Sequence, residues 1–214
     1  MNTYVAFGIL GIISNFAAAW ADVPLVKPGK TNPNEGLSLN DVNPWWADVT
    51  SKRFKVSFWL SFLGQPGSYI TMWLLADLIS QGNEALALAL KINTFIGCYT
   101  GLLCHVVFCM KPLLYQKLHK KMSDNESLEV IKSINPVVNA PMIIGFLALW
   151  LGATIIVAIA ILTGALAVPK WCLLLNPVVS LLVLMPLKKC GVKIIGALGV
   201  GYMLFSVLLI IAGI

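Results

Sequence analysis

The chain has 214 residues, of which 58% are hydrophobic and 11% are charged, and its mean hydropathy is +0.85. So little polar surface cannot cover a water-soluble globule, and we expect a bilayer to solvate most of the molecule. The formal net charge of +6 would suit a nucleic-acid partner, but the basic residues cluster beside apolar segments rather than along one soluble face, which argues against nucleic acid.

Six apolar segments are long enough to cross a bilayer as helices. A transmembrane helix needs about 20 mainly apolar residues, because the hydrocarbon core is about 30 Å thick. The six segments are residues 4–21, 56–80, 85–114, 141–167, 171–187 and 193–214. The first resembles a signal peptide but lacks a charged n-region, so we expect a retained helix. The sequence therefore predicts an all-α polytopic membrane protein, a single transmembrane domain built as a bundle of six transmembrane helices.

The basic residues indicate how these helices are oriented. All of the 15 Lys and Arg residues except Lys91 and Lys170 lie in the first, third and fifth connections. Because cytoplasmic loops retain Lys and Arg near helix ends, these connections are predicted to be cytoplasmic and both chain termini to lie outside. The implied location is the cell membrane, as in a bacterial inner membrane, with membrane lipids as partners.

Residues 22–55 form the longest connection, a predicted cytoplasmic loop rich in Pro, Gly and Asn. Trp45 and Trp46 suit headgroup depth, where they would anchor the loop, or they belong to a lid that closes over a ligand. Asp22 either forms an ion pair with Arg53 or Lys55 or serves with Asp48 around a polar headgroup. The two tryptophans and the two aspartates are candidate ligand-binding residues.

The third connection contains a helix signal. Ser123 and Glu126 have the spacing of a capping box, and apolar residues follow at helical intervals. We expect a short interfacial helix over residues 124–134 that lays its apolar stripe on the membrane surface. Binding to a partner protein is the alternative.

Glycines and prolines mark where helices should pack or break. Gly97 and Gly101 form GxxxG in the third span, which permits close contact with a neighbouring span or with a second subunit, so a homo-oligomer is an open alternative. Pro66 and Pro177 interrupt the second and fifth spans, and each removes a backbone hydrogen bond. Ordinary proline kinks are one explanation, and a binding site near the membrane midplane is the other.

Few candidate site residues lie within the spans. Titratable side chains are expensive inside a bilayer, so His105 in the third span is the candidate catalytic residue. A neutral imidazole can give a proton to a lipophilic substrate or take one from it; the alternative is a structural histidine bonded across helices. Tyr99 on a neighbouring turn, and Gln65 and Asn176 beside the two prolines, are candidate ligand-binding residues.

Signatures of several enzyme classes are missing from the sequence. It contains no HExxH, GxSxG, Walker A or Rossmann motif. Its two histidines, and its five cysteines without CxxC spacing, are too few and too scattered for a haem, di-iron or other metal site. We therefore expect no metal and no cofactor.

The order of features resembles a known group of proteins. The first span ends in Asp22, a loop with Gly and Pro follows, and the segment from Trp46 to Arg53 leads into a second span that contains glycines. This order is similar to that of small, uncharacterised six-helix bacterial membrane proteins grouped as a domain of unknown function, a resemblance that implies a membrane bundle but carries over no catalytic residues. In size and aromatic content the chain also resembles emopamil-binding-type sterol isomerases, whose membrane cavities use acidic and His groups on lipophilic substrates; it departs from them in helix number and in having no Glu within a span.

These features favour one functional hypothesis. The protein is expected to bind or transform a lipophilic small molecule in an intramembrane cavity, with His105 as acid or base. A small-solute transporter that uses the broken spans is the first alternative. A noncatalytic membrane partner protein is the second.

Overall fold

The computed structural model describes residues 2–26, 44–189 and 196–214. The helices are α1 (Thr3–Val26), α2 (Ser51–Ser80), α3 (Glu84–Leu118), α4 (Asp124–Lys132), α5 (Asn135–Phe146), α6 (Ala153–Thr163), α7 (Pro177–Lys189) and α8 (Ala197–Ala212). A π-helix at Leu147–Gly152 joins α5 to α6, and 3-10 turns lie at Pro44–Trp46 and Lys170–Leu174. No strand occurs in these parts of the chain, so the predicted all-α class is confirmed.

Three helical segments are long and apolar enough to cross a membrane. They are Thr3–Leu25, Glu84–Leu118 and Asn135–Thr163, the last being formed by α5, the π-helix and α6. α7 and α8 supply shorter apolar helices. α2 is long but less apolar, because Ser, Thr and Gly occupy much of its buried face. The described helices therefore indicate a membrane protein.

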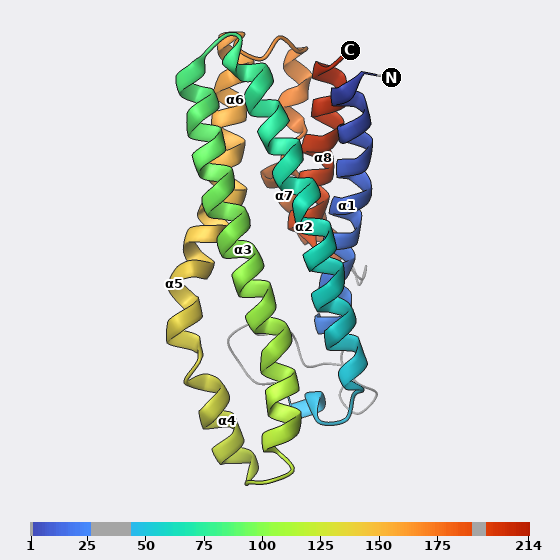
Figure 1. Cartoon of the computed structure of the whole chain (residues 1–214), viewed down its shortest axis with the longest axis vertical. Helices are drawn as coiled ribbons and strands as arrows, with labels where there is room; N and C mark the ends of the chain where they lie inside the picture. Colours follow the sequence, from blue (N-terminus) through green and yellow to red (C-terminus); the bar gives the residue numbers. More distant parts are fainter. Residues whose placement is uncertain (1, 27–43, 190–195) are drawn as a thin grey trace.

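The helices form an elongated bundle with both chain ends at the same end (Figure 1). α1 packs along α2 and α8, and α3 packs along α2 and α5. The Asn2 side-chain amide donates to the Gly213 carbonyl at 2.5 Å and so ties the two ends of the chain together. α4 and the 3-10 turn at Pro44–Trp46 lie at the opposite end of the bundle.

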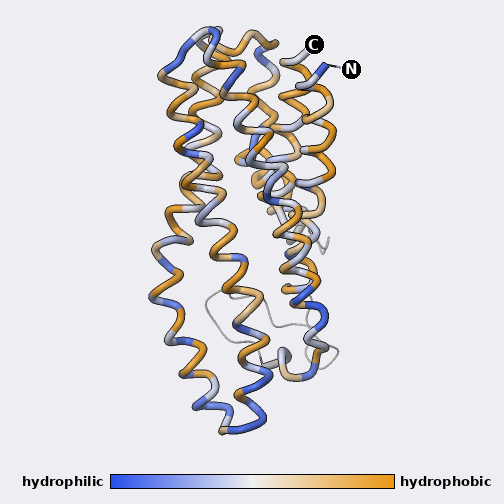
Figure 2. Tube along the Cα trace, in the orientation of Figure 1, coloured by the Kyte–Doolittle hydropathy of each residue, from blue (hydrophilic) through white to orange (hydrophobic). Residues whose placement is uncertain are grey.

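Hydropathy differs between the middle of the bundle and its ends. Figure 2 shows hydrophobic residues along the helices, whereas hydrophilic residues gather at the α2–α3 turn and at the α3–α4 turn. Near the chain termini, Lys91 Nζ lies 2.6 Å from Asp77 Oδ1 and 4.8 Å from the centre of the Trp73 ring. This pattern is the one expected when lipid surrounds the middle and water meets both ends.

Glycines let α1 approach its two neighbours closely. A Cβ on Gly64 of α2 would collide with Ser14 and Ala18 of α1, and a Cβ on Gly199 of α8 would collide with the backbone of Ala19. Helices in lipid associate mainly through such close backbone contact, because lipid tails remove the hydrophobic drive. The small residues on these faces therefore determine how α1, α2 and α8 assemble.

The π-helix at Leu147–Gly152 is the main backbone irregularity. A π-helix shifts the regular hydrogen-bond ladder and leaves carbonyls to be satisfied by other groups. The Asn93 amide donates to the Ala148 carbonyl at 3.0 Å, and the Tyr202 hydroxyl donates to the Leu149 carbonyl at 3.4 Å. Side chains from α3 and α8 thus hold the π-helix in place.

The predicted GxxxG pair packs against this π-helix. A Cβ on Gly97 or on Gly101 would meet the side chain of Leu149. The pair therefore accepts a side chain from within the same chain. Of the two partners that the sequence left open, the structure shows the neighbouring span.

The two prolines behave differently from each other. α2 continues through Pro66 as one helix, as an ordinary proline kink allows, so the span is not broken there. α7 begins at Pro177, and the Asn176 side chain accepts a hydrogen bond from the backbone N–H of Val179 at 3.0 Å. Asn176 is thus the N-cap, and Pro177 occupies the first helical position, where its missing N–H leaves no carbonyl unpaired.

Helices extend into both ends of the predicted connection 22–55. α1 continues to Val26 and therefore includes Asp22, while α2 already begins at Ser51. Residues 27–43 lie outside the described residues. The helical setting of Asp22 corrects its assignment to a loop, since the side chain projects from α1 toward the other helices.

The two tryptophans before α2 are buried in the protein. Trp45 is 3% exposed and Trp46 is 7% exposed, and both belong to a cluster with Tyr115 and Ile131. The Gln116 amide donates to the Trp46 carbonyl at 2.7 Å and so fastens this segment to α3. The interpretation of these residues as anchors at headgroup depth is therefore wrong, because their rings contact protein rather than lipid.

α4 has the capping box that its sequence predicts. The Ser123 N–H donates to Glu126 Oε2 at 2.9 Å, and the Glu126 N–H donates to Ser123 Oγ at 3.4 Å. Ile131 on the apolar side of α4 is 1% exposed, because it packs into the cluster around Trp46. That side of the helix thus faces the bundle instead of lying on a membrane surface.

Candidate functional site

A cavity of about 290 Å³ lies among α1, α2, α3, α5, the π-helix and α8. Its volume is close to the lower limit of small-molecule sites, which measure about 300–1,000 Å³. Much of the wall is apolar and includes Leu25, Phe108, Met142, Phe146, Leu149 and Leu198. Asp22, Gln65 and His105 interrupt this wall with polar groups, a combination typical of sites that bind apolar molecules by one polar end.

Small residues from four elements create the space. Ala18, Gly101, Gly145 and Gly199 all line the cavity. A Cβ on Gly145 would collide with the Thr100 side chain, so α5 and α3 approach closely there. Glycine and alanine lack the larger side chains that would fill this space, so they leave room beside His105.

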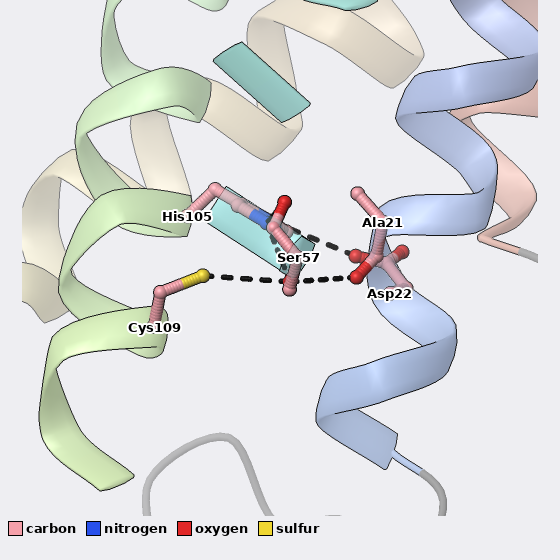
Figure 3. Close-up of polar contacts among 5 residues, drawn as sticks. All are labelled: Ala21, Asp22, Ser57, His105 and Cys109. Atoms are coloured by element: carbon pink, nitrogen blue, oxygen red, sulfur yellow. Dashed lines mark hydrogen bonds and ion pairs between the residues drawn. The ribbon is translucent and has the colours of Figure 1, made fainter. Parts of the chain in front are cut away.

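The Ser57 hydroxyl is the centre of a polar group that joins three helices (Figure 3). Ser57 Oγ of α2 donates to the Ala21 carbonyl of α1 at 2.7 Å. The same oxygen lies 3.1 Å from His105 Nε2 of α3 and accepts from the Cys109 thiol at 3.4 Å. His105 Nε2 is also 3.4 Å from the Ser57 carbonyl. Ser57 thereby fixes the orientation of the imidazole ring.

The other ring nitrogen of His105 faces Asp22. Nδ1 lies 3.7 Å from Asp22 Oδ1, which is too long for a direct hydrogen bond, since these span 2.7–3.2 Å. The His105 side chain is 13% exposed and that of Asp22 is 45% exposed. Figure 3 shows the two side chains approaching each other from α3 and α1. A molecule in the cavity would thus meet an open pair of titratable groups.

The structure brings together three of the predicted site residues. Asp22, Gln65 and His105 all line the cavity, although they come from three different helices. Among the described residues, Asp22 lies within ion-pair distance of His105. Arg53, which the sequence offered as a partner for Asp22, donates from Nε to the Pro24 carbonyl at 2.7 Å.

The other predicted site residues lie away from the cavity wall. Trp45 and Trp46 are buried in the cluster with Tyr115, and Asp48 follows them as an exposed residue. Tyr99 is 64% exposed on the outer surface of α3, where it stacks on a neighbouring phenylalanine. Asn176 caps α7. The positions of these residues in the sequence could not predict that they lie away from the cavity around His105.

Sequence reasoning missed Ser57 and Tyr202. A usable signal for Ser57 was present, because Ser57, Ser61, Gly64, Ser68 and Thr71 recur at alternating intervals of four and three residues, as on one face of a helix. All five are buried. Such a stripe of small polar residues predicts a helix face that contacts other helices and carries the hydrogen bonds between them.

Among the described residues, no three His, Cys, Asp or Glu side chains lie close enough to hold a metal ion. The Cys109 thiol donates to Ser57, and Cys109 does not line the cavity that Asp22 and His105 line.

The family model described as "Family of unknown function (DUF6796)" matches residues 1–214. The chain belongs to this family. The predicted resemblance to an uncharacterised domain of unknown function is thereby confirmed. No curated protein and no solved structure matches the chain.

Proposed function

We propose that the protein is a multi-pass membrane protein of the cell membrane that binds a lipophilic small molecule in the cavity beside His105. We also propose that the chain crosses the membrane six times and that both termini lie outside the cell. Three apolar segments of spanning length support it, as does the position of both chain ends at one end of the bundle. The basic residues Lys52, Lys117 and Lys132 belong to helix ends at the opposite end, as cytoplasmic residues should.

The open Asp22–His105 pair on an apolar cavity wall is the observation that carries the binding proposal. Titratable side chains are expensive at membrane depth and persist where they serve a ligand or a proton path. A histidine with a purely structural role would use both ring nitrogens within the protein. Nε2 of His105 has its partner in Ser57, whereas Nδ1 and Asp22 Oδ1 are too far apart to satisfy each other.

The structure supports the transporter alternative less than it supports ligand binding. This alternative relied on helices broken at Pro66 and Pro177, with unpaired carbonyls along a solute path. α2 is continuous at Pro66, Pro177 starts a capped helix, and neither proline lines the cavity. Binding from the lipid phase is the function that the cavity supports best.

Filling the cavity tests this function. Met142 of α5 lines the cavity, whereas its neighbour Ile143 is 56% exposed on the outer surface. We expect Met142→Trp to reduce the amount of lipophilic small molecule that copurifies with the protein about tenfold, equivalent to about 1.4 kcal/mol of binding free energy. Mass spectrometry of organic extracts measures this amount.

Ile143→Trp is the matched control, because it adds the same ring one position along the same helix but outside the cavity. It should retain the copurifying molecule at the level of the unsubstituted protein. Equal retention by both variants would show that nothing binds in the cavity, and the proposal would fall.

A further inference from the structure

The hydrogen-bond roles around Ser57 determine which nitrogen of His105 carries a proton. A serine hydroxyl has one hydrogen, and the Ala21 carbonyl can only accept, so Ser57 donates to Ala21. Toward His105, Ser57 Oγ must therefore accept, and Nε2 must carry a hydrogen. The Ser57 carbonyl, 3.4 Å from Nε2, imposes the same requirement.

A second proton must lie between His105 and Asp22. With Nε2 protonated, a neutral imidazole presents a lone pair on Nδ1, which would oppose an ionised Asp22 carboxylate across 3.7 Å. A proton on either group removes this repulsion and makes the pair neutral as a whole. Neutrality is favoured in a medium where an unpaired charge costs several kcal/mol.

The 3.7 Å between His105 Nδ1 and Asp22 Oδ1 suits one bridging atom that contacts both. An oxygen atom placed about 2.8 Å from both Nδ1 and Oδ1 would make two good hydrogen bonds. It must accept from whichever group holds the proton and donate to the other. A hydroxyl does both, whereas a carboxylate only accepts and an ammonium only donates.

We infer that the cavity takes an uncharged amphiphile whose hydroxyl bridges Asp22 and His105, and that Ser57 is the positioning residue that presents Nδ1 to it. This inference rests on the proposed function and names its ligand class. The apolar side chains of Phe108, Met142 and Leu198 receive the hydrocarbon part. At about 30 Å³ for each water-sized group, the cavity of about 290 Å³ holds roughly ten non-hydrogen atoms.

Four probes with alkyl chains of nine or ten carbons test the hydroxyl directly: 1-decanol, decane, decanoate and decylammonium. They are titrated into the full chain in detergent micelles, and the His105 side-chain nitrogen resonances are followed by NMR. His119→Gln leaves His105 as the single histidine, since the chain has two. We expect 1-decanol to bind with a Kd about tenfold or more below those of the other three, because it alone makes both hydrogen bonds.

The outcomes separate this inference from the proposed function. If decane binds as tightly as 1-decanol, the cavity binds ligands but a bridging water occupies the polar position, and the hydroxyl inference is overturned. Tighter binding of decanoate or of decylammonium also overturns it, since the pair would then carry a net charge. If none of the probes binds, the proposed function fails as well.

A longer alcohol distinguishes two sources of the hydroxyl. 1-Hexadecanol exceeds the capacity of the cavity, so it binds as well as 1-decanol only if its chain leaves toward the bilayer. Equal binding would identify the hydroxyl end of a long lipid as the ligand, and weaker binding would identify a short alcohol. Both results support the bridging hydroxyl.

Ser57→Ala tests the positioning role. Without the hydroxyl, Nε2 loses its closer acceptor, and we expect His105 to show a mixture of protonation patterns by NMR and a Kd for 1-decanol that rises about tenfold. Ser57→Thr retains the hydroxyl and should restore both properties. Ser80→Ala is the matched control, because its hydroxyl donates within the far end of the same helix. An unchanged His105 spectrum in Ser57→Ala would overturn the positioning role.

Discussion

Two clusters of polar side chains lie inside the bundle, one around Asn15 and one around His105. In the Asn15 cluster, the hydrogen bonds of the Asn15 side chain are all satisfied. The Asn15 amide donates to Ser206 Oγ at 3.2 Å and to the Tyr202 carbonyl at 3.3 Å, while its oxygen accepts from the Ser68 hydroxyl. Ser206 in turn donates to the Tyr202 carbonyl at 2.9 Å and lies 3.2 Å from Thr71 Oγ1. Every polar atom of the Asn15 side chain is thus used between α1, α2 and α8.

The group around His105 is open on one side. Nε2 is bonded to Ser57, but Nδ1 and Asp22 Oδ1 face each other without a direct hydrogen bond. Asn15 is fully buried, whereas the Asp22 side chain is 45% exposed. The difference teaches that polarity at membrane depth has two uses. A satisfied uncharged network joins helices, and an unsatisfied titratable pair, under the proposed function, binds a ligand.

The largest expected effect is on stability, from Asn15→Leu. This change removes three hydrogen bonds between helices and leaves Ser68 and Ser206 short of partners. Each such bond contributes about 0.6 kcal/mol in membrane proteins, so we expect the free energy of unfolding to fall by about 2 kcal/mol. Unfolding titrations with SDS measure it. A loss below about 0.5 kcal/mol would mean that this network does not join the helices.

A double-mutant cycle between Asn15→Ala and Ser206→Ala should show a smaller, specific effect. Because the two side chains share a hydrogen bond of 3.2 Å, their coupling free energy should be about 0.6 kcal/mol. The same unfolding titration serves for the four proteins of the cycle. Additive losses would show that the two residues act independently, and the description of a network would be wrong.

Asp22→Asn and His105→Gln should change stability by less than about 0.5 kcal/mol, since the pair makes no direct hydrogen bond and functional sites are seldom optimised for stability. Ligand binding should weaken in both variants. The contrast with Asn15→Leu is then one between fold and function. If either variant destabilises the protein as much as Asn15→Leu, the pair belongs to the structural network and the comparison breaks.

The smallest effect concerns α4, which lies outside both groups and responds to pH on its own. Hydrogen bonds from the Ser123 hydroxyl and backbone N–H lower the pKa of Glu126 below its ordinary value of 4.5. A lowered pKa stabilises the folded helix above pH 4.5, and this contribution is lost as pH falls through the lower folded value. Amide hydrogen exchange should therefore show faster opening of α4 in acid, with α1 and α8 unaffected.

Glu129→Gln and Glu126→Gln form a matched pair for this test. Both remove one carboxylate from α4, but only Glu126 takes part in the capping box. Glu126→Gln should abolish the acid response of α4, and Glu129→Gln should preserve it. A similar response in both would assign the effect to overall helix charge rather than to the cap.

The sequence alone predicted helices suited to a lipid bilayer and some of the local structure. Hydrophobic content and segment length established helices suited to lipid, since these depend on transfer of side chains one by one. The capping box of Ser123 and Glu126 was predictable because its partners lie three residues apart. His105 stood out as a candidate because a titratable residue within an apolar run is costly wherever the helix packs.

Only the tertiary structure decided which residues meet His105. Asp22 became its neighbour because α1 continues to Val26, and Ser57 became its partner because α2 packs along α3. Trp45 was predicted to lie at the membrane surface, but packing between helices places it in a buried protein cluster. Contacts between helices depend on which face of each helix turns inward. That orientation depends on packing across the whole chain and not on any one segment.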